Sequence, residues 1–177
     1  MTICIGMKIT GGRVLIAADR RTTTGGTILC SPATKITKFR DWLLATSGST
    51  ADVHLFLHGL PPDTDFADPF WYSARIKTVT EHDNGLTEVS GEPNGISFAM
   101  IAAKGPDLYA YNAHGAMWPA GDWDVCGASA TTALAWLTNH APTGMDEAEA
   151  RALARQLYEF MAKAELSIGD GLDIEVT

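Results

Sequence analysis

The sequence predicts an α+β fold in which two antiparallel sheets are stacked and helices cover their outer faces. Three observations support this class: short apolar or alternating runs fill the first 45 residues, similar runs return in the middle of the chain, and two helical segments precede a last short strand. In this arrangement each helix and each sheet would bury its apolar face.

Size and composition predict a single domain over residues 1–177 with a sizeable core. Hydrophobic residues make up 46% of the chain and charged residues 19%, so disorder is not expected. A net charge of −8 argues against a general nucleic-acid or anionic-membrane binder, because such proteins present a basic surface.

The location expected from the sequence is the cytoplasm. No run approaches the roughly 18 apolar residues of a membrane span, and no export signal is recognised at the N-terminus. Cys4, Cys30 and Cys126 are sparse and widely spaced, which suits a reducing compartment and forms no zinc pattern. We expect no cofactor.

The first half of the chain reads as strands followed by a helix. The expected strands are Thr2–Ile9, Val14–Ala18, Thr27–Cys30, Lys35–Phe39 and Trp42–Thr46. Ser49 or Thr50 can cap a helix that Pro61-Pro62 stops, with Val53, Phe56, Leu57 and Leu60 on one face.

The middle segment, 63–95, allows two interpretations. Asn84-Gly85 between Arg75–Glu81 and Leu86–Val89 fits a type I′ hairpin, whereas Pro69–Val79 fits a short helix. The pattern does not separate them.

The second half returns to strands and then helices. We expect strands at Ile96–Ala103, Leu108–Asn112, Trp123–Cys126 and Leu172–Val176, and helices at Ala130–Asn139 and Asp146–Leu166. Acidic residues in the first turn of the longer helix favour its start there.

Thr2 is the first candidate for chemistry. Methionine is trimmed readily before a small side chain, so Thr2 can become the terminal residue. A terminal threonine carries a hydroxyl nucleophile and an amine base in one residue. The amine has a pKa of about 7.7–8.0, close to working pH.

Three further positions form a coherent set with Thr2. Asp19 follows the run Val14–Ala18, Lys35 begins a later strand, and Gly48 lies between a strand and a helix. A lysine favours the deprotonated form of a neighbouring nucleophile, and a carboxylate can hold that lysine. A backbone N–H at a strand–helix junction can bind an oxyanion.

The chain resembles the proteasome β-subunits and HslV-type peptidases, which are N-terminal-nucleophile (Ntn) hydrolases. The resemblance covers most of the chain outside 63–95, where that family usually carries a second long helix and this chain is expected to differ. It is carried by Thr2-Ile3, Val14–Thr22, Lys35-Ile36, Ser47–Asp52, Asp107–Asn112 with Gly115, Val125–Ser129 and Gly169–Ile174.

The resemblance implies a four-layer αββα sandwich and a role for each matching position. Thr2 corresponds to the nucleophile, Asp19 and Lys35 to the charge pair beside it, and Gly48 to the oxyanion glycine. The supporting serine of the family falls on Ala128 with Ser129 next to it. Its C-terminal aspartate and serine fall on Glu165 and Ile168, so Ser129 and Glu165 are the candidates for the supporting roles.

The implied function is a threonine endopeptidase that cleaves peptides or unfolded proteins inside a homo-oligomeric ring fed by an AAA+ unfoldase. The departures at Ala128 and Ile168 leave an alternative open: a catalytically inactive subunit, cellular or phage-encoded, with a structural or assembly role. Amide hydrolysis of a small metabolite uses the same chemistry, usually in larger chains. The resemblance also allows a structural cation near Gly169–Asp173.

Overall fold

The computed structural model describes residues 2–24, 27–28, 33–87, 98–112, 114–127 and 129–177. Its helices are α1 (Thr50–Leu57), α2 (Pro69–Thr87), α3 (Ala130–His140) and α4 (Glu147–Ala164). Its strands are β1 (Ile3–Ile9), β2 (Arg13–Asp19), β3 (Thr23–Thr24), β4 (Thr27–Ile28), β5 (Ile36–Phe39), β6 (Trp42–Gly48), β7 (Phe98–Lys104), β8 (Asp107–Tyr111), β9 (Met117–Pro119), β10 (Trp123–Gly127) and β11 (Leu172–Val176).

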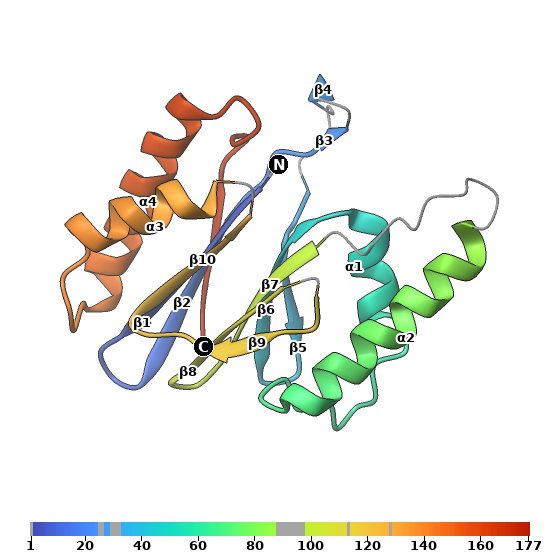
Figure 1. Cartoon of the computed structure of the whole chain (residues 1–177). Coiled ribbons are helices and arrows are strands. Elements are labelled where there is room, and N and C mark those ends of the chain that lie inside the picture. The colour runs from blue at the N-terminus through green and yellow to red at the C-terminus, as the bar shows by residue number, and fades with distance from the viewer. Residues whose placement is uncertain (1, 25–26, 29–32, 88–97, 113, 128) are drawn as a thin grey trace.

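Two antiparallel sheets form the centre of the molecule. One has the strand order β10-β1-β2-β11 and the other β5-β6-β7-β8-β9, while β3 and β4 make a small separate pair. Figure 1 shows α3 and α4 outside the first sheet and α1 and α2 outside the second. The predicted arrangement of two sheets between helices is therefore confirmed.

The strands at the centre are apolar along their length because both of their faces are covered. In β1, Ile3, Ile5 and Met7 pack toward α3 and α4, whereas Cys4 faces the second sheet. At Gly6 a Cβ atom would lie 2.6 Å from Leu108 Cδ1 of the facing sheet, so a larger residue here would displace the Leu108 side chain between the closely packed sheets.

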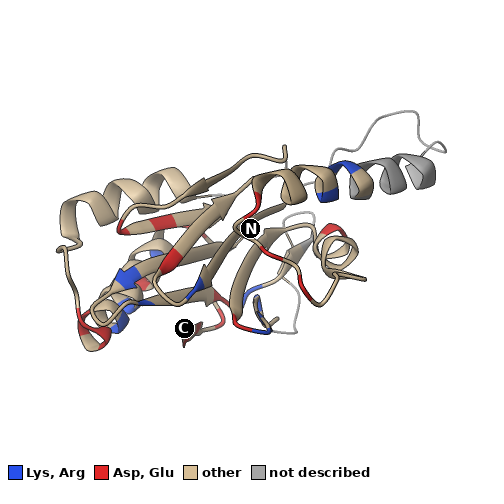
Figure 2. Cartoon of the chain, turned by 90° about the horizontal axis from the view of Figure 1, so that it is seen from below, with Lys and Arg blue, Asp and Glu red and all other residues tan. Residues whose placement is uncertain are grey.

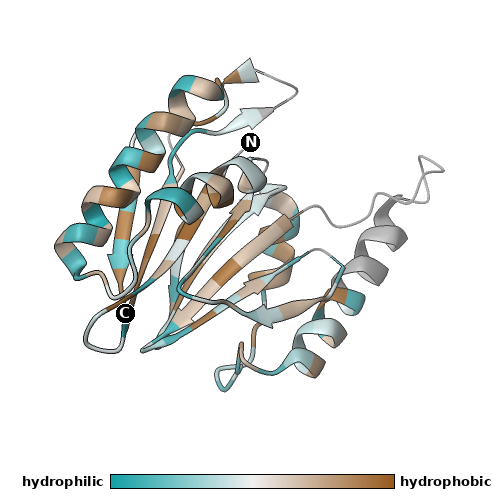
Figure 3. Cartoon of the chain, turned by 60° about the vertical axis from the view of Figure 1, so that its left-hand side comes forward, coloured by the Kyte–Doolittle hydropathy of each residue, from teal (hydrophilic) through white to brown (hydrophobic). Residues whose placement is uncertain are grey.

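The outer helices are held by amphipathic packing. The buried side of α4 consists of Ala150, Leu153, Ala154, Leu157 and Met161, and Figure 3 shows its hydrophilic residues on the side away from the sheet. Asp146 and Glu149 form a capping box at the start of α4, as expected for a helix beginning at this aspartate.

The middle segment contains a long helix, so the hairpin interpretation of Asn84-Gly85 is wrong. Both residues lie inside α2, and the predicted strand at Leu86–Val89 is helical as far as Thr87. Asp68 Oδ1 accepts hydrogen bonds from the N–H groups of Phe70 and Trp71 at the start of this helix. The expectation that 63–95 lacks a second long helix is therefore corrected, with 88–95 outside the described residues.

Smaller differences concern element boundaries. The helix expected to reach Leu60 ends at Leu57, and the strand pairs β3–β4 and β8–β9 include the short strands β3 and β9, which were not predicted. The second half of the strand expected at Thr27–Cys30 lies outside the described residues. Within the described part of the chain, no helix is long and apolar enough to cross a membrane.

Candidate active site

The site is organised by the carboxylate of Asp19, the last residue of β2. Asp19 is fully buried. Its Oδ1 accepts hydrogen bonds from the Ile3 N–H at 2.9 Å and from Lys35 Nζ at 2.9 Å, and its Oδ2 accepts one from the Arg21 N–H at 3.1 Å. These three donors satisfy the hydrogen-bonding capacity that a buried carboxylate would otherwise leave unpaired.

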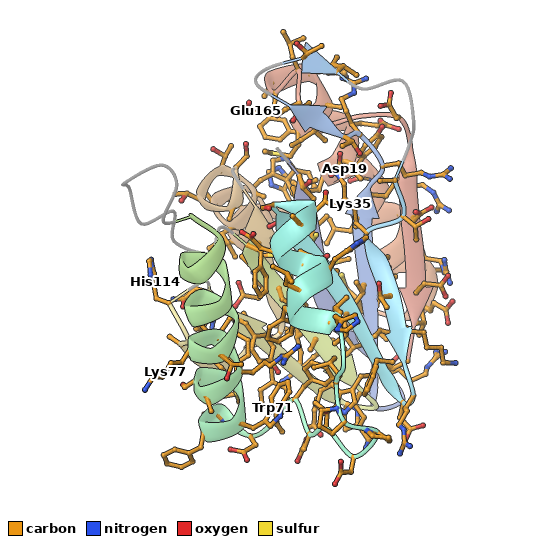
Figure 4. The ribbon with its side chains drawn as sticks, turned by 90° about the vertical axis from the view of Figure 1, so that its right-hand side faces the viewer. Asp19, Lys35, Trp71, Lys77, His114 and Glu165 are labelled. Carbon is orange, nitrogen blue, oxygen red and sulfur yellow. The ribbon has the colours of Figure 1, made fainter. Side chains whose placement is uncertain are left out.

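Lys35, just before β5, is held by two oxygens. Besides the contact with Asp19, its Nζ donates to the Arg21 carbonyl at 2.6 Å, and its side chain is only 10% exposed. The predicted charge pair between Asp19 and Lys35 is therefore present, and Figure 4 shows the two side chains close together at one end of the sheets.

Thr2 precedes β1 and is 8% exposed. It packs against Gly127 at the end of β10, where a Cβ atom would lie 1.9 Å from the Thr2 carbonyl oxygen. Gly127 also has φ +121°, a conformation that residues with a side chain rarely adopt. The backbone position of Thr2 thus depends on a glycine opposite it.

Gly48 ends β6 and has φ 120°. The next residue, Ser49, is the N-cap of α1, and its side chain accepts a hydrogen bond from the Asp52 N–H. The strand–helix junction expected from the sequence is therefore present at this glycine.

Thr2, Lys35 and Gly48 line one cavity of about 730 Å³. This volume lies within the range of about 300–1,000 Å³ that is usual for ligand sites. One wall is a face of α1, and the described lining residues include seven threonines and no carboxylate. The remaining lining residues are Arg21, Thr22, Thr23, Ala33, Thr34, Thr37, Thr46, Ser47, Thr50, Val53, His54, Leu57, Phe98, Ala99, His114 and Gly127.

The cavity extends beyond the charge pair. In Figure 4, Lys35 lies on one side of α1 and His114 on the other, beside α2. The apolar lining residues Val53, Leu57 and Phe98 belong to α1 and β7. An extended chain that enters the cavity would therefore meet both hydroxyl-bearing and apolar walls.

Arg21 joins this site to the loop before β11. Its guanidinium contacts both carboxylate oxygens of Asp170, at 3.2 and 3.1 Å, and donates to the Leu166 carbonyl at 2.6 Å. The hydrogen bond with Asp170 raises the pKa of Arg21 and lowers that of Asp170. A Cβ atom at Gly169 would lie 2.4 Å from Arg21 Cζ, so a side chain there would displace the guanidinium from its present position.

The loop near Gly169–Asp173 was the place where the resemblance allowed a cation. Arg21 binds Asp170 there, and Arg20 Nε lies 3.6 Å from Asp173 Oδ1. The described residues contain no group of three or more His, Cys, Asp or Glu side chains suited to a metal ion. Arginine side chains therefore provide the positive charge that faces these carboxylates.

Ser129 and Glu165 occupy helix ends rather than the described cavity wall. Ser129 is buried at the N-cap of α3 and makes no side-chain capping hydrogen bond. Glu165 is the half-buried C-cap of α4, toward the same end of the molecule as Asp19 and Lys35 in Figure 4. Neither lines the cavity among the described residues. Ile168 is buried in the apolar cluster beneath α4, and Ala128 lies outside the described residues.

Sequence reasoning missed two residues of this site. The Arg21 carbonyl holds Lys35, which no side-chain pattern could indicate. Gly127 fixes the space beside Thr2. Its position within Val125–Ser129 was recognised, but the close backbone approach depends on the pairing of β1 with β10, in which Ile3 faces Gly127.

Comparison with known proteins identifies the fold. No protein-family model matches the sequence. The structure of BPH from Thiobacillus denitrificans, solved in complex with epoxomicin, has a TM-score of 0.69 and 20% identity, and covers 100% of this chain and 98% of its own. Eukaryotic HslV from Trypanosoma brucei also has a TM-score of 0.69, with 16% identity and 98% of each chain covered. The chain thus shares the αββα fold of these two structures, as the resemblance to HslV-type peptidases implies.

Proposed function

We propose that this chain is an N-terminal threonine peptidase whose nucleophile is Thr2. The observation that carries the proposal is the presence of Thr2, Lys35 and Gly48 on one cavity, with Asp19 buried behind Lys35. The fold shared with HslV supports the same class of chemistry.

The first step needs a free amine at Thr2, so the bond between Met1 and Thr2 must be cleaved. The Thr2 hydroxyl then attacks the peptide carbonyl, and the α-amine takes the hydroxyl proton. The Lys35 ammonium favours the deprotonated hydroxyl, because a nearby positive charge lowers the pKa of such a group. Asp19 orients that ammonium through its hydrogen bond.

The second step completes hydrolysis. The Gly48 N–H would donate to the oxyanion, a contribution that is typically worth about 10²–10³ in kcat. Collapse of the tetrahedral intermediate breaks the C–N bond, and the leaving amine takes its proton from the Thr2 ammonium. Water then hydrolyses the ester on Thr2 and regenerates the hydroxyl and amine.

We further propose that the substrates are peptides or unfolded proteins, and that the chain acts in the cytoplasm as a homo-oligomeric ring fed by an AAA+ unfoldase. The threonine-rich and partly apolar cavity supports binding of an extended peptide segment. The ring is what the resemblance to HslV-type peptidases implies, and the fold shared with HslV agrees with it.

The test is covalent labelling by a peptide epoxyketone. The ketone and the epoxide are two electrophilic sites that match the hydroxyl and the free amine of a terminal threonine. We expect labelling of the wild type and of Thr2→Ser, and none of Thr2→Ala. Equal labelling of the wild type and Thr2→Ala would refute Thr2 as the nucleophile.

A second candidate function is a catalytically inactive subunit with an assembly role. The observation that favours it is the environment of Ile168, which is 1% exposed and packs among apolar side chains. In the proteasome β-subunits and HslV-type peptidases, the resemblance implies a hydrogen-bonding serine at this position. This candidate predicts that folded wild-type protein is not labelled and retains Met1.

A further inference from the structure

Two cysteines lie directly behind the candidate active site. Cys4 is in β1, two residues after Thr2, and Cys126 is in β10, immediately before Gly127. The two residues are directly opposite each other in the antiparallel pairing of these strands. Both are free thiols, 0% and 6% exposed, in the apolar cluster between the two sheets.

Both sulfurs contact β6, the strand that ends at Gly48. Cys4 Sγ donates to the Thr46 carbonyl at 3.4 Å, and Ser47 Oγ donates to Cys126 Sγ at 3.7 Å. Thr46 and Ser47 both line the cavity. The thiols therefore connect the strand that follows the nucleophile with the strand that carries the oxyanion glycine.

We propose that Cys4 and Cys126 form a redox-sensitive link that positions β6 relative to Thr2. The link rests on the proposed peptidase function and adds two positioning residues to it. Opposite residues of an antiparallel pair have Cα atoms about 4.5–5.5 Å apart, within the span of about 4.4–6.8 Å that a disulfide bridges. The two thiols can therefore be joined without separating the strands.

The oxidant in this reaction is a low-molecular-weight disulfide. One cysteine thiolate attacks it, forming a mixed disulfide and releasing one small thiol. The other thiolate then attacks the protein sulfur of the mixed disulfide and releases the second small thiol. Two S–H bonds are lost, one S–S bond forms, and the small disulfide is reduced. Cys4 then has no proton to donate to Thr46, so its contact with β6 is lost.

The environment of Cys4 sets the pH dependence of this oxidation. The hydrogen bond with Cys126 and burial raise the pKa of the Cys4 thiol, Asp19 adds to the rise, and Lys35 opposes it. Because the thiolate is the reacting form, oxidation is slow at neutral pH and accelerates as the pH rises. The two thiols therefore stay reduced in a reducing compartment.

The experiment uses the full chain carrying Cys30→Ser, which leaves Cys4 and Cys126 as its two thiols. Reduced protein is compared with protein treated with glutathione disulfide at pH 7 and pH 9. Peptide mapping detects the Cys4–Cys126 disulfide. The rate of epoxyketone labelling measures the site, and hydrogen–deuterium exchange of the β6 peptide reports strand position independently of activity.

We expect the disulfide to form faster at pH 9. It should lower the labelling rate about ten- to a hundredfold, and raise exchange in β6, with both effects reversed by dithiothreitol. Cys4→Ala should label slowly before treatment and show no further loss after it.

Two results would overturn the inference: failure of the disulfide to form at either pH, or a disulfide that changes neither labelling nor exchange. A reduced protein that is never labelled, but whose β6 exchange rises on oxidation, would refute the peptidase proposal while supporting the link.

Discussion

At the scale of single residues, the buried charge of Asp19 determines how the site is built. Its carboxylate receives donors from the start of β1, from the residues after β2 and from Lys35. One side chain thus fixes the strand that begins next to Thr2 and the ammonium that faces the cavity.

Lys35→Met tests the pair through stability. It removes the charged partner and leaves Asp19 buried with two backbone donors. Loss of one member of a buried pair typically destabilises by about 3–5 kcal/mol. We expect a decrease of this size in the free energy of unfolding, measured with urea at pH 7. Lys38→Met, at an exposed position of β5, is the matched control and should change it by less than about 0.5 kcal/mol. Equal midpoints for the two variants would contradict the role given to Lys35.

Gly127→Ala tests the space beside Thr2. The new methyl group would overlap the Thr2 carbonyl, so the backbone of Thr2 must move. A displacement of about 1 Å can lower reactivity about 10²-fold. We expect a loss of this order in the second-order rate constant for epoxyketone labelling. Gly121→Ala, where nothing lies within 4 Å of a new Cβ atom, should label like the wild type.

The sequence predicts those parts of the candidate site in which a side chain has the functional role. Asp19 and Gly48 end the strands β2 and β6, and Lys35 directly precedes β5, so all three stand at strand ends that the sequence pattern indicates. Ser129 and Glu165 could not be placed in this way, because their positions depend on where α3 begins and α4 ends. The hydrogen bond from Lys35 Nζ to the Arg21 carbonyl could not be predicted either, because it depends on the path of the folded backbone.

At the scale of elements, most strands follow from local patterns because central strands such as β1, β2 and β7 are buried along most of their length. Three of the helices follow from their caps and apolar faces. The exception is α2, where Asn84-Gly85 indicates a turn if read alone. Asp68 and Pro69 form a strong helix start that outweighs it, since aspartate caps free N–H groups and proline fits the first helical position. Packing of Tyr72 and Ile76 against the second sheet adds to the helix.

The ion pair of Arg21 with Asp170 gives an element-scale prediction on pH. Arg21 lowers the pKa of Asp170 in the folded state, below the ordinary value of about 3.9. A lowered folded-state pKa gives stability above the unfolded pKa that is lost as the pH falls through the folded one. We expect Asp170→Asn to lower Tm near neutral pH, with the difference from the wild type shrinking below a pH of about 4.

The control for this measurement is Asp122→Asn, an exposed position in the turn before β10. Its Tm should follow that of the wild type across the same pH range. A difference between Asp170→Asn and the wild type that stays constant down to pH 2 would show that the ion pair is not the cause.

At the scale of the whole molecule, the sandwich brings the ends of β1, β2, β6 and β10 together around one cavity. Figure 2 shows Lys and Arg residues interspersed with Asp and Glu residues along the ribbon. The negative net charge of −8 therefore coexists with a cavity whose described lining has no carboxylate. The proposed peptide substrate would therefore meet no carboxylate among the described lining residues.

The proposed ring gives a prediction about mass. Native mass spectrometry of the chain, 18.9 kDa as a monomer, should show an assembly of several copies. The exposed side chains of Phe70 and Leu166, at 85% and 86%, are available for contacts between copies. A single species at the monomer mass at micromolar concentration would argue against a chamber.

The most direct test of the central claim is the mass of the N-terminal peptide of protein purified from its native host and treated with a peptide epoxyketone. We predict a peptide that begins at Thr2, lacks Met1 and carries the probe on Thr2. Quantitative retention of Met1, with no probe attached, would contradict the claim that Thr2 is the nucleophile.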